Sequence, residues 1–121
     1  MDFKEGTVGG APGSEAPGPL QLVVMCYDAV IGDLRQAKGF QQGGSVEEAR
    51  GKVLHAQDVV TELLVGLDYE QGGALAQNLG RIYNYMLRRM IGITGDENGE
   101  LYDELIAIME GLKTSWEQIQ T

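Results

Sequence analysis

The sequence predicts an all-α protein, an antiparallel four-helix bundle, and three observations support this fold. Apolar residues recur at steps of three and four in four successive segments, which is the spacing of one helix face. Glycine-rich stretches separate these segments, and short connections favour antiparallel neighbours. No segment shows the period-two alternation of a strand over a useful length.

The first helix is expected to begin at Pro19, because proline fits the first turn of a helix. Glycine commonly stands at helix ends, so Gly39 and then Gly43 and Gly44 are expected to end it. Its apolar stripe consists of Val23, Tyr27, Val30, Leu34 and Ala37.

The second helix carries the most regular apolar pattern in the chain. Ser45 and Glu48 form a capping-box pattern, in which each side chain satisfies an exposed amide of the other residue. Residues 68–73 then predict a turn. The stripe consists of Val46, Ala49, Val53, Ala56, Val60, Leu63 and Leu67.

The third and fourth helices are separated by a break at residues 92–99. The third stripe is Ala76, Leu79, Tyr83, Met86 and Met90. The fourth is Leu101, Leu105, Ile108, Leu112, Trp116 and Ile119.

Residues 1–18 are expected to form a flexible N-terminal tail, and residues 19–121 the helical-bundle domain. Residues 1–19 hold five of the 18 glycines and all three prolines, with only Phe3 and Val8 as sizeable apolar residues. Such a segment buries too little surface to offset the entropy lost on ordering.

Charge and composition exclude several function classes. The chain has 9 basic and 18 acidic residues, and the net charge of −9 argues against binding to duplex nucleic acid or an anionic membrane. One cysteine and one histidine are too few for a typical zinc site, and no nucleophile motif is present. We therefore expect no enzyme activity, cofactor or metal. Without a membrane-spanning run or signal peptide, a cytoplasmic location is expected.

Residues 72–95 form the only net basic segment, with Arg81, Arg88 and Arg89 and no acidic residue. These arginines can form exposed ion pairs with the acidic second and fourth helices. Alternatively, Arg88 and Arg89 can bind an acidic or carboxylate-bearing partner, because arginine binds such groups bidentately.

Several segments in the same order resemble the FliS family of flagellar export chaperones. Residues 25–28, Met-Cys-Tyr-Asp, follow Pro19 as in the opening of that family. Gly18 stands where the family usually has a capping serine. The resemblance covers residues 18–118 and continues in residues 56–63, 67–68, 72–73, 75–79 and 82–89, and in Trp116.

The resemblance implies a cytoplasmic chaperone that binds the disordered C-terminal segment of newly made flagellin. It would hold that segment as helices along the bundle surface and so prevent polymerisation before export. The flagellar export gate is a second candidate partner, and no nucleotide or metal is implied.

Eight residues are candidates for partner binding. Methionine adapts to irregular partners, although methionine at helical spacing is more commonly a core residue. We expect the rings of Tyr27 and Tyr83 to pack in the bundle with their hydroxyls at its surface. Tyr85 lies about 200° from Tyr83 around the helix and should point elsewhere. The candidates are Met25, Tyr27, Tyr83, Met86, Leu87, Arg88, Arg89 and Met90.

Two other functions stay open from the sequence. Histidine phosphotransfer domains are also four-helix bundles, and His55 could carry the phosphate, but Asp58 one turn later would repel it. A non-catalytic scaffold or dimerisation bundle is the second alternative.

Overall fold

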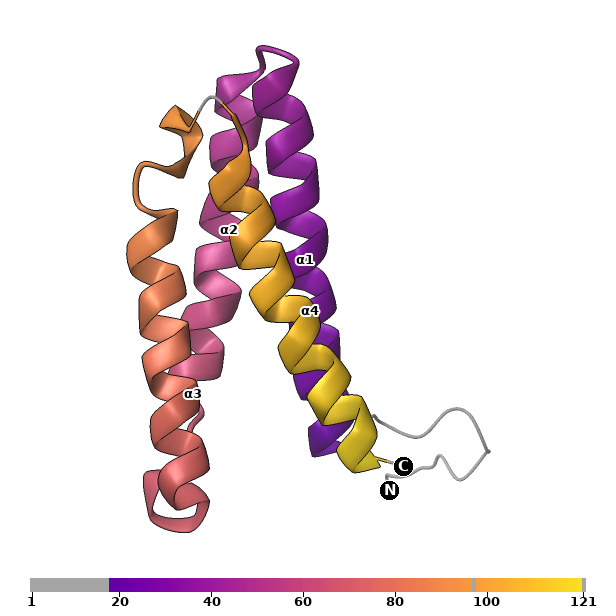
Figure 1. Cartoon of the computed structure of the whole chain (residues 1–121), viewed down its shortest axis with the longest axis vertical. Coiled ribbons are helices and arrows are strands. Elements are labelled where there is room, and N and C mark those ends of the chain that lie inside the picture. The colour runs from indigo at the N-terminus through magenta and orange to yellow at the C-terminus, as the bar shows by residue number, and fades with distance from the viewer. Residues whose placement is uncertain (1–17, 97, 121) are drawn as a thin grey trace, which may run out of the picture.

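The computed structural model describes residues 18–96 and 98–120, which form four long helices and no strand (Figure 1). The predicted tail, apart from Gly18, lies outside the described residues. The helices are α1 (Pro19–Gln42), α2 (Val46–Val65), α3 (Tyr69–Met90) and α4 (Glu100–Gln120), with a short 3₁₀ helix η1 (Ile93–Gly95) before α4.

Consecutive helices run antiparallel, which confirms the predicted all-α bundle. α1 packs against both α2 and α4, and α3 packs against α2. Figure 1 shows α3 and α4 closest where α4 begins, and well apart at the opposite end of the bundle. The bundle is therefore splayed at the end that holds the start of α3 and the end of α4.

The predicted apolar stripes of α1 and α3 lie in the core. In α1 only Val23 is half-buried, and every member of the α3 stripe is buried. In α2 the stripe is buried from Ala49 to Val60, whereas Val46 is exposed at the helix start. These residues remove a continuous apolar surface from water, which is the main stabilising contribution to such a bundle.

The predicted stripe of α4 is partly wrong. Leu101 and Ile108 are only half-buried and Ile119 is exposed. The Tyr102 hydroxyl donates to Gln41 Oε1 of α1 at 2.8 Å, so a residue with a polar tip occupies a core position. The buried residues of α4 are Tyr102, Leu105, Ile106 and Met109.

Two predicted helix ends also differ from the structure. Gly39 lies inside α1, which continues to Gln42. The Ser45 side chain makes no capping hydrogen bond, so the capping box is not formed. Instead, the Ser45 amide donates to the Phe40 carbonyl at 2.7 Å, and Glu48 is left without the donor that a capping box requires.

α3 begins within the predicted turn. Asp68 caps it, accepting from the Glu70 and Gln71 amides at 3.1 Å each. Gly73 then interrupts the helix with φ 52° and ψ −128°, a conformation that is strained for any residue with a Cβ. The first turn of α3 therefore points away from the helix that follows.

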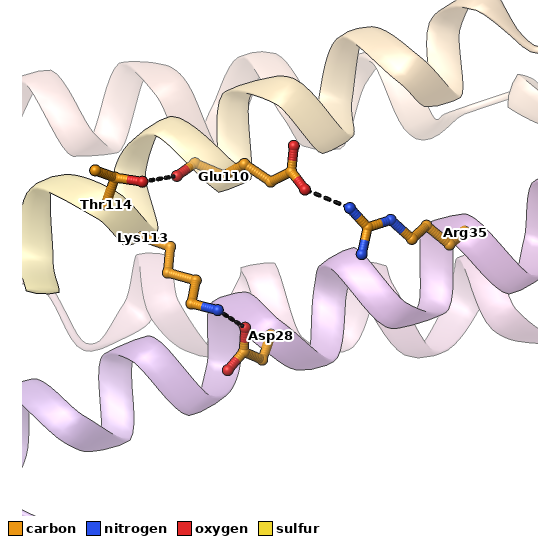
Figure 2. Close-up of polar contacts among 5 residues, drawn as sticks. All are labelled: Asp28, Arg35, Glu110, Lys113 and Thr114. Atoms are coloured by element: carbon orange, nitrogen blue, oxygen red, sulfur yellow. Dashed lines mark hydrogen bonds and ion pairs between the residues drawn. The ribbon is translucent and has the colours of Figure 1, made fainter.

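Ion pairs join α4 to α1 along their exposed edges (Figure 2). Lys113 Nζ lies 2.7 Å from Asp28 Oδ1, and Arg35 pairs with Glu110. The hydrogen bond to Asp28 raises the pKa of Lys113. Because such pairs are solvated, each contributes little to stability, and apolar burial holds the two helices together.

Candidate functional site

An apolar cleft of about 430 Å³ opens at the splayed end of the bundle. It is the candidate functional site because apolar concave surfaces of this kind accept the side chains of a bound ligand or helix. Its lining residues are Val23, Glu62, Leu63, Gly66, Leu67, Asp68, Gln71, Gly72, Leu75, Ala76, Leu79, Tyr83 and Trp116.

All four helices contribute to the cleft. Val23 comes from the first turns of α1 and Trp116 from the last turns of α4. The end of α2, the connection that follows it and the first half of α3 supply the rest. Leu75 is 53% exposed, whereas Leu79 is buried, so the cleft reaches from the surface to the core.

A chain of hydrogen bonds lies beneath the cleft and joins three helices. Trp116 Nε1 of α4 donates to the Tyr27 hydroxyl of α1 at 2.7 Å. That hydroxyl lies 2.6 Å from the hydroxyl of Tyr83 in α3. The two tyrosine rings meet edge to face, with centroids 6.5 Å apart. These contacts fix Trp116 and Tyr83, which both line the cleft.

The expectation that both tyrosine hydroxyls lie at the surface was wrong. Tyr27 is fully buried and Tyr83 is 1% exposed. Because the hydroxyls bond to each other and to the indole, they can be buried without losing all their hydrogen bonds. Burial is the main cause that raises the pKa of both groups, so both stay neutral well above physiological pH.

Comparison with known proteins assigns the sequence to a family. Residues 13–121 match the sequence profile of the family described as "Flagellar protein FliS". The chain belongs to the FliS family. The resemblance predicted from the residues is thereby confirmed.

Several curated FliS proteins are similar to this chain. The flagellar secretion chaperone FliS of Salmonella typhimurium is 32% identical over 104 residues, covering 84% of this chain and 76% of that protein. FliS of Vibrio cholerae is 28% identical, with 86% and 76% covered. FliSB of Pseudomonas aeruginosa is 30% identical, with 84% and 80% covered. A secretion chaperone has no enzymatic role, in agreement with the sequence-based expectation.

The FliS resemblance led to eight candidate residues, and the structure places them in two groups. Tyr27, Tyr83, Met86 and Met90 are buried, and Tyr83 alone of the eight lines the cleft. The others are accessible from solvent: Met25, Leu87, Arg88 and Arg89.

Of the three arginines in the basic segment, residues 72–95, only Arg89 lies near a carboxylate of a neighbouring helix among the described residues. Arg89 lies 3.9 Å from Glu104 of α4 and stacks over the Tyr85 ring, and the Tyr85 hydroxyl donates to Glu104. Arg81 bonds to Asn78 within α3. Arg88 is exposed and has no ion pair within residues 18–96 and 98–120.

Most cleft residues were not identified as functional from the sequence. Leu63, Leu79 and Trp116 were assigned to core stripes, which is where their spacing puts them. Leu75 lies outside the apolar stripe predicted for α3, but it stands four residues before Leu79, which is the spacing of one helix face. The sequence alone therefore did not distinguish this exposed cleft residue from a core residue.

A second hollow of about 390 Å³ lies at the other end of α3. Met90, Ile91 and Leu54 contribute apolar surface to it, and Arg50 stands beside them. Its lining is more polar than that of the cleft, so it offers less apolar surface to a bound helix.

The ring of His55 is hydrogen-bonded to an acidic side chain of the protein itself. Its Nδ1 lies 2.5 Å from Oδ2 of Asp33, a residue of α1 that is nearly buried. Two carboxylates, Asp33 and Asp58, therefore stand near a ring that would have to carry phosphate. This arrangement and the FliS membership both disfavour the phosphotransfer alternative.

The described residues offer neither a metal-binding cluster nor a membrane-spanning helix. No group of three or more histidine, cysteine, aspartate or glutamate side chains there could hold a metal ion. None of the described helices is long and apolar enough to cross a membrane.

Proposed function

We propose that this protein is a cytoplasmic export chaperone that binds the disordered C-terminal segment of flagellin as helices and prevents its polymerisation before secretion. Membership of the FliS family supports a chaperone role in flagellar export. The apolar cleft is the observation that carries the finer proposal, because an amphipathic segment needs such a surface for its apolar face.

The exposed apolar surface extends beyond the cleft. A disordered segment loses several kcal/mol of entropy on ordering, so it must bury on the order of 1,000–3,000 Å² to bind. The cleft alone is too small for this area. Large apolar side chains that are exposed on the same elements include Leu22, Met25, Val65 and Tyr69.

Of the eight predicted partner-binding residues, we assign direct contact to five. Met25 and Leu87 offer apolar surface, and Tyr83 lines the cleft. Arg88 and Arg89 are proposed to bind carboxylates of the segment, because arginine forms bidentate hydrogen bonds with them.

The remaining three predicted residues are proposed to act from the core. Tyr27 holds Tyr83 and Trp116 in place. Met86 and Met90 are buried and anchor in the core the helix that also carries Leu87 and Arg88. The flagellar export gate is a second proposed partner, because an export chaperone must deliver its cargo there.

Calorimetric titration of the full chain with a peptide of the flagellin C-terminal segment, from the same organism, tests this proposal. We expect 1:1 binding, a gain of helical circular dichroism and a higher melting temperature, because the ligand binds the folded state. Self-association of the chain without any heat of peptide binding would instead identify a scaffold bundle.

A further inference from the structure

Tyr69, in the first turn of α3, lies against a later part of the same helix. The axis of α3 changes direction at Gly73, whose φ is 52°. An uninterrupted helix would separate Tyr69 from Gly80 by about 16 Å along its axis, which is beyond the reach of a tyrosine side chain. In the structure, however, a Cβ at Gly80 would lie only 2.8 Å from the Tyr69 hydroxyl. The break at Gly73 therefore allows the tyrosine to reach back to its own helix.

Gly80 leaves the space that this contact needs. Leu67 also approaches the position, and its Cδ1 would lie 3.6 Å from a Cβ there, which is an ordinary van der Waals contact. At 2.8 Å, in contrast, the Tyr69 hydroxyl and a Cβ would overlap, so a methyl group at this position would displace the tyrosine. Gly80 is itself buried. The absence of a side chain at Gly80 is therefore what allows Tyr69 to lie there.

The residues around Tyr69 form a wall of the cleft, here called the wall segment, residues 67–72. Leu67, Asp68, Gln71 and Gly72 all line the cleft, and Tyr69 stands among them in the chain. The turn has its own hydrogen bonds, because the Asp68 side chain caps it and the Gly72 amide donates to the Asp68 carbonyl at 2.8 Å. A turn closed in this way moves as a unit, so a shift of Tyr69 would shift the lining.

We propose that Gly80 and Tyr69 are positioning residues of the cleft, and that their contact holds the wall segment in the place where the flagellin segment packs against it. This inference rests on the proposed chaperone function. Neither residue lines the cleft, so their contact acts on the bound segment through the wall segment. A wall that is in place before binding lowers the cost of ordering side chains at the interface.

The Gly80→Ala substitution tests this contact. It removes no group that the flagellin segment could touch, because Gly80 is buried and lies outside the cleft lining. The added methyl group should displace Tyr69 and the wall segment with it. We expect calorimetry on the full chain to show that binding of the flagellin C-terminal peptide is weakened about threefold to tenfold. Circular dichroism verifies that the variant is folded.

Gly51→Ala is the matched control. Gly51 also lies inside a helix, but no atom of another element lies within 4 Å of a Cβ placed there. It stands near the start of α2, whereas the cleft is built from the end of that helix. We expect the peptide affinity of Gly51→Ala to stay within about twofold of that of the unmodified chain.

A second substitution tests whether Tyr69 carries the effect of Gly80→Ala. Without the hydroxyl, the nearest atoms of Leu67 and Tyr69 lie 3.6 and 3.7 Å from the added Cβ, so Tyr69→Phe makes room for it. The hydroxyl has no hydrogen-bond partner among the described residues, so Tyr69→Phe alone should bind the peptide normally. The double variant should regain an affinity within about twofold of the unmodified chain.

Two results would overturn the inference while leaving the chaperone proposal in place. One is undiminished affinity in Gly80→Ala. The other is a double variant that binds as weakly as Gly80→Ala, since the added methyl group would then act without Tyr69. Failure of the unmodified chain to bind the peptide would overturn both the inference and the chaperone proposal.

Discussion

The indole of Trp116 and the hydroxyl of Tyr27 are hydrogen-bonded at 2.7 Å, which ties the last turns of α4 to α1. This bond lies at the splayed end of the bundle, where α4 and α3 are far apart. Without it, α4 would be held to α1 there by apolar packing and by exposed pairs such as Lys113–Asp28. The bond therefore fixes one wall of the cleft.

The Tyr27→Phe substitution tests the strength of this connection. It removes the acceptor of Trp116 and one partner of Tyr83, and it leaves polar groups unpaired in or near the core. We expect the free energy of unfolding in urea to fall by about 1–3 kcal/mol. Tyr85→Phe, at an exposed hydroxyl, is the control, and an equal loss in both variants would contradict this account.

Stability should decline at alkaline pH. Burial raises the pKa of Tyr27 and Tyr83 above the unfolded value of 10.0. As pH rises, the two phenols therefore lose their protons in the unfolded chain before they lose them in the folded protein. Their contribution to the free energy of unfolding is complete below pH 10 and is lost as pH rises above 10. Each group should contribute a slope of about −1.4 kcal/mol per pH unit.

Urea unfolding between pH 9 and 11.5 measures that slope. Tyr83→Phe removes one titrating group, so its stability should fall less steeply with pH than that of the unmodified chain. Parallel curves for the two proteins would show that the buried phenols do not cause the alkaline loss.

Replacing two glycines by alanine should change the stability of the protein in opposite directions. Gly51 lies inside α2 with open space around its would-be Cβ, so Gly51→Ala should stabilise by about 0.5–1 kcal/mol through helix propensity. Gly73 has a positive φ, so Gly73→Ala should destabilise by about 1–3 kcal/mol. Thermal melts of both variants check the prediction, and stabilisation by Gly73→Ala would disprove the need for a break there.

The Asp33–His55 pair should be coupled in stability. His55→Ala leaves the nearly buried Asp33 carboxylate without its partner and should cost about 1–3 kcal/mol. Adding Asp33→Ala should cost less than the sum of the two single changes, because the unpaired carboxylate is then absent. Additive effects in urea unfolding would show that the two side chains act independently.

The sequence predicted the helices and most of the core, because periodic apolar spacing determines which face of an isolated helix is buried. It misplaced the buried face of α4, because Tyr102, a residue with a polar hydroxyl, occupies a core position that the apolar pattern did not include. The cleft could not be predicted, since leucines such as Leu79 have the same spacing in a closed bundle as in a splayed one. The splay arises from tertiary packing, because α4 packs against α1 and α3 against α2, and the bond from Trp116 to Tyr27 holds the end of α4 to α1.

The central claim is that the cleft at the splayed end binds the flagellin segment. Two leucines of nearly equal exposure allow a matched test: Leu75 at the cleft is 53% exposed and Leu54 at the second hollow is 55% exposed. Either can accept glutamate without a buried charge being created. A difference in peptide affinity between the two glutamate variants therefore reports where the peptide binds and does not reflect a loss of folding.

The decisive measurement is calorimetric titration of Leu75→Glu and Leu54→Glu with the flagellin C-terminal peptide. We predict that Leu75→Glu weakens binding at least about tenfold, because it removes apolar contact and adds a third carboxylate to a rim that already holds Glu62 and Asp68. Leu54→Glu should bind within about twofold of the unmodified chain. Full affinity in Leu75→Glu would contradict the account, because the flagellin segment would then bind without the cleft.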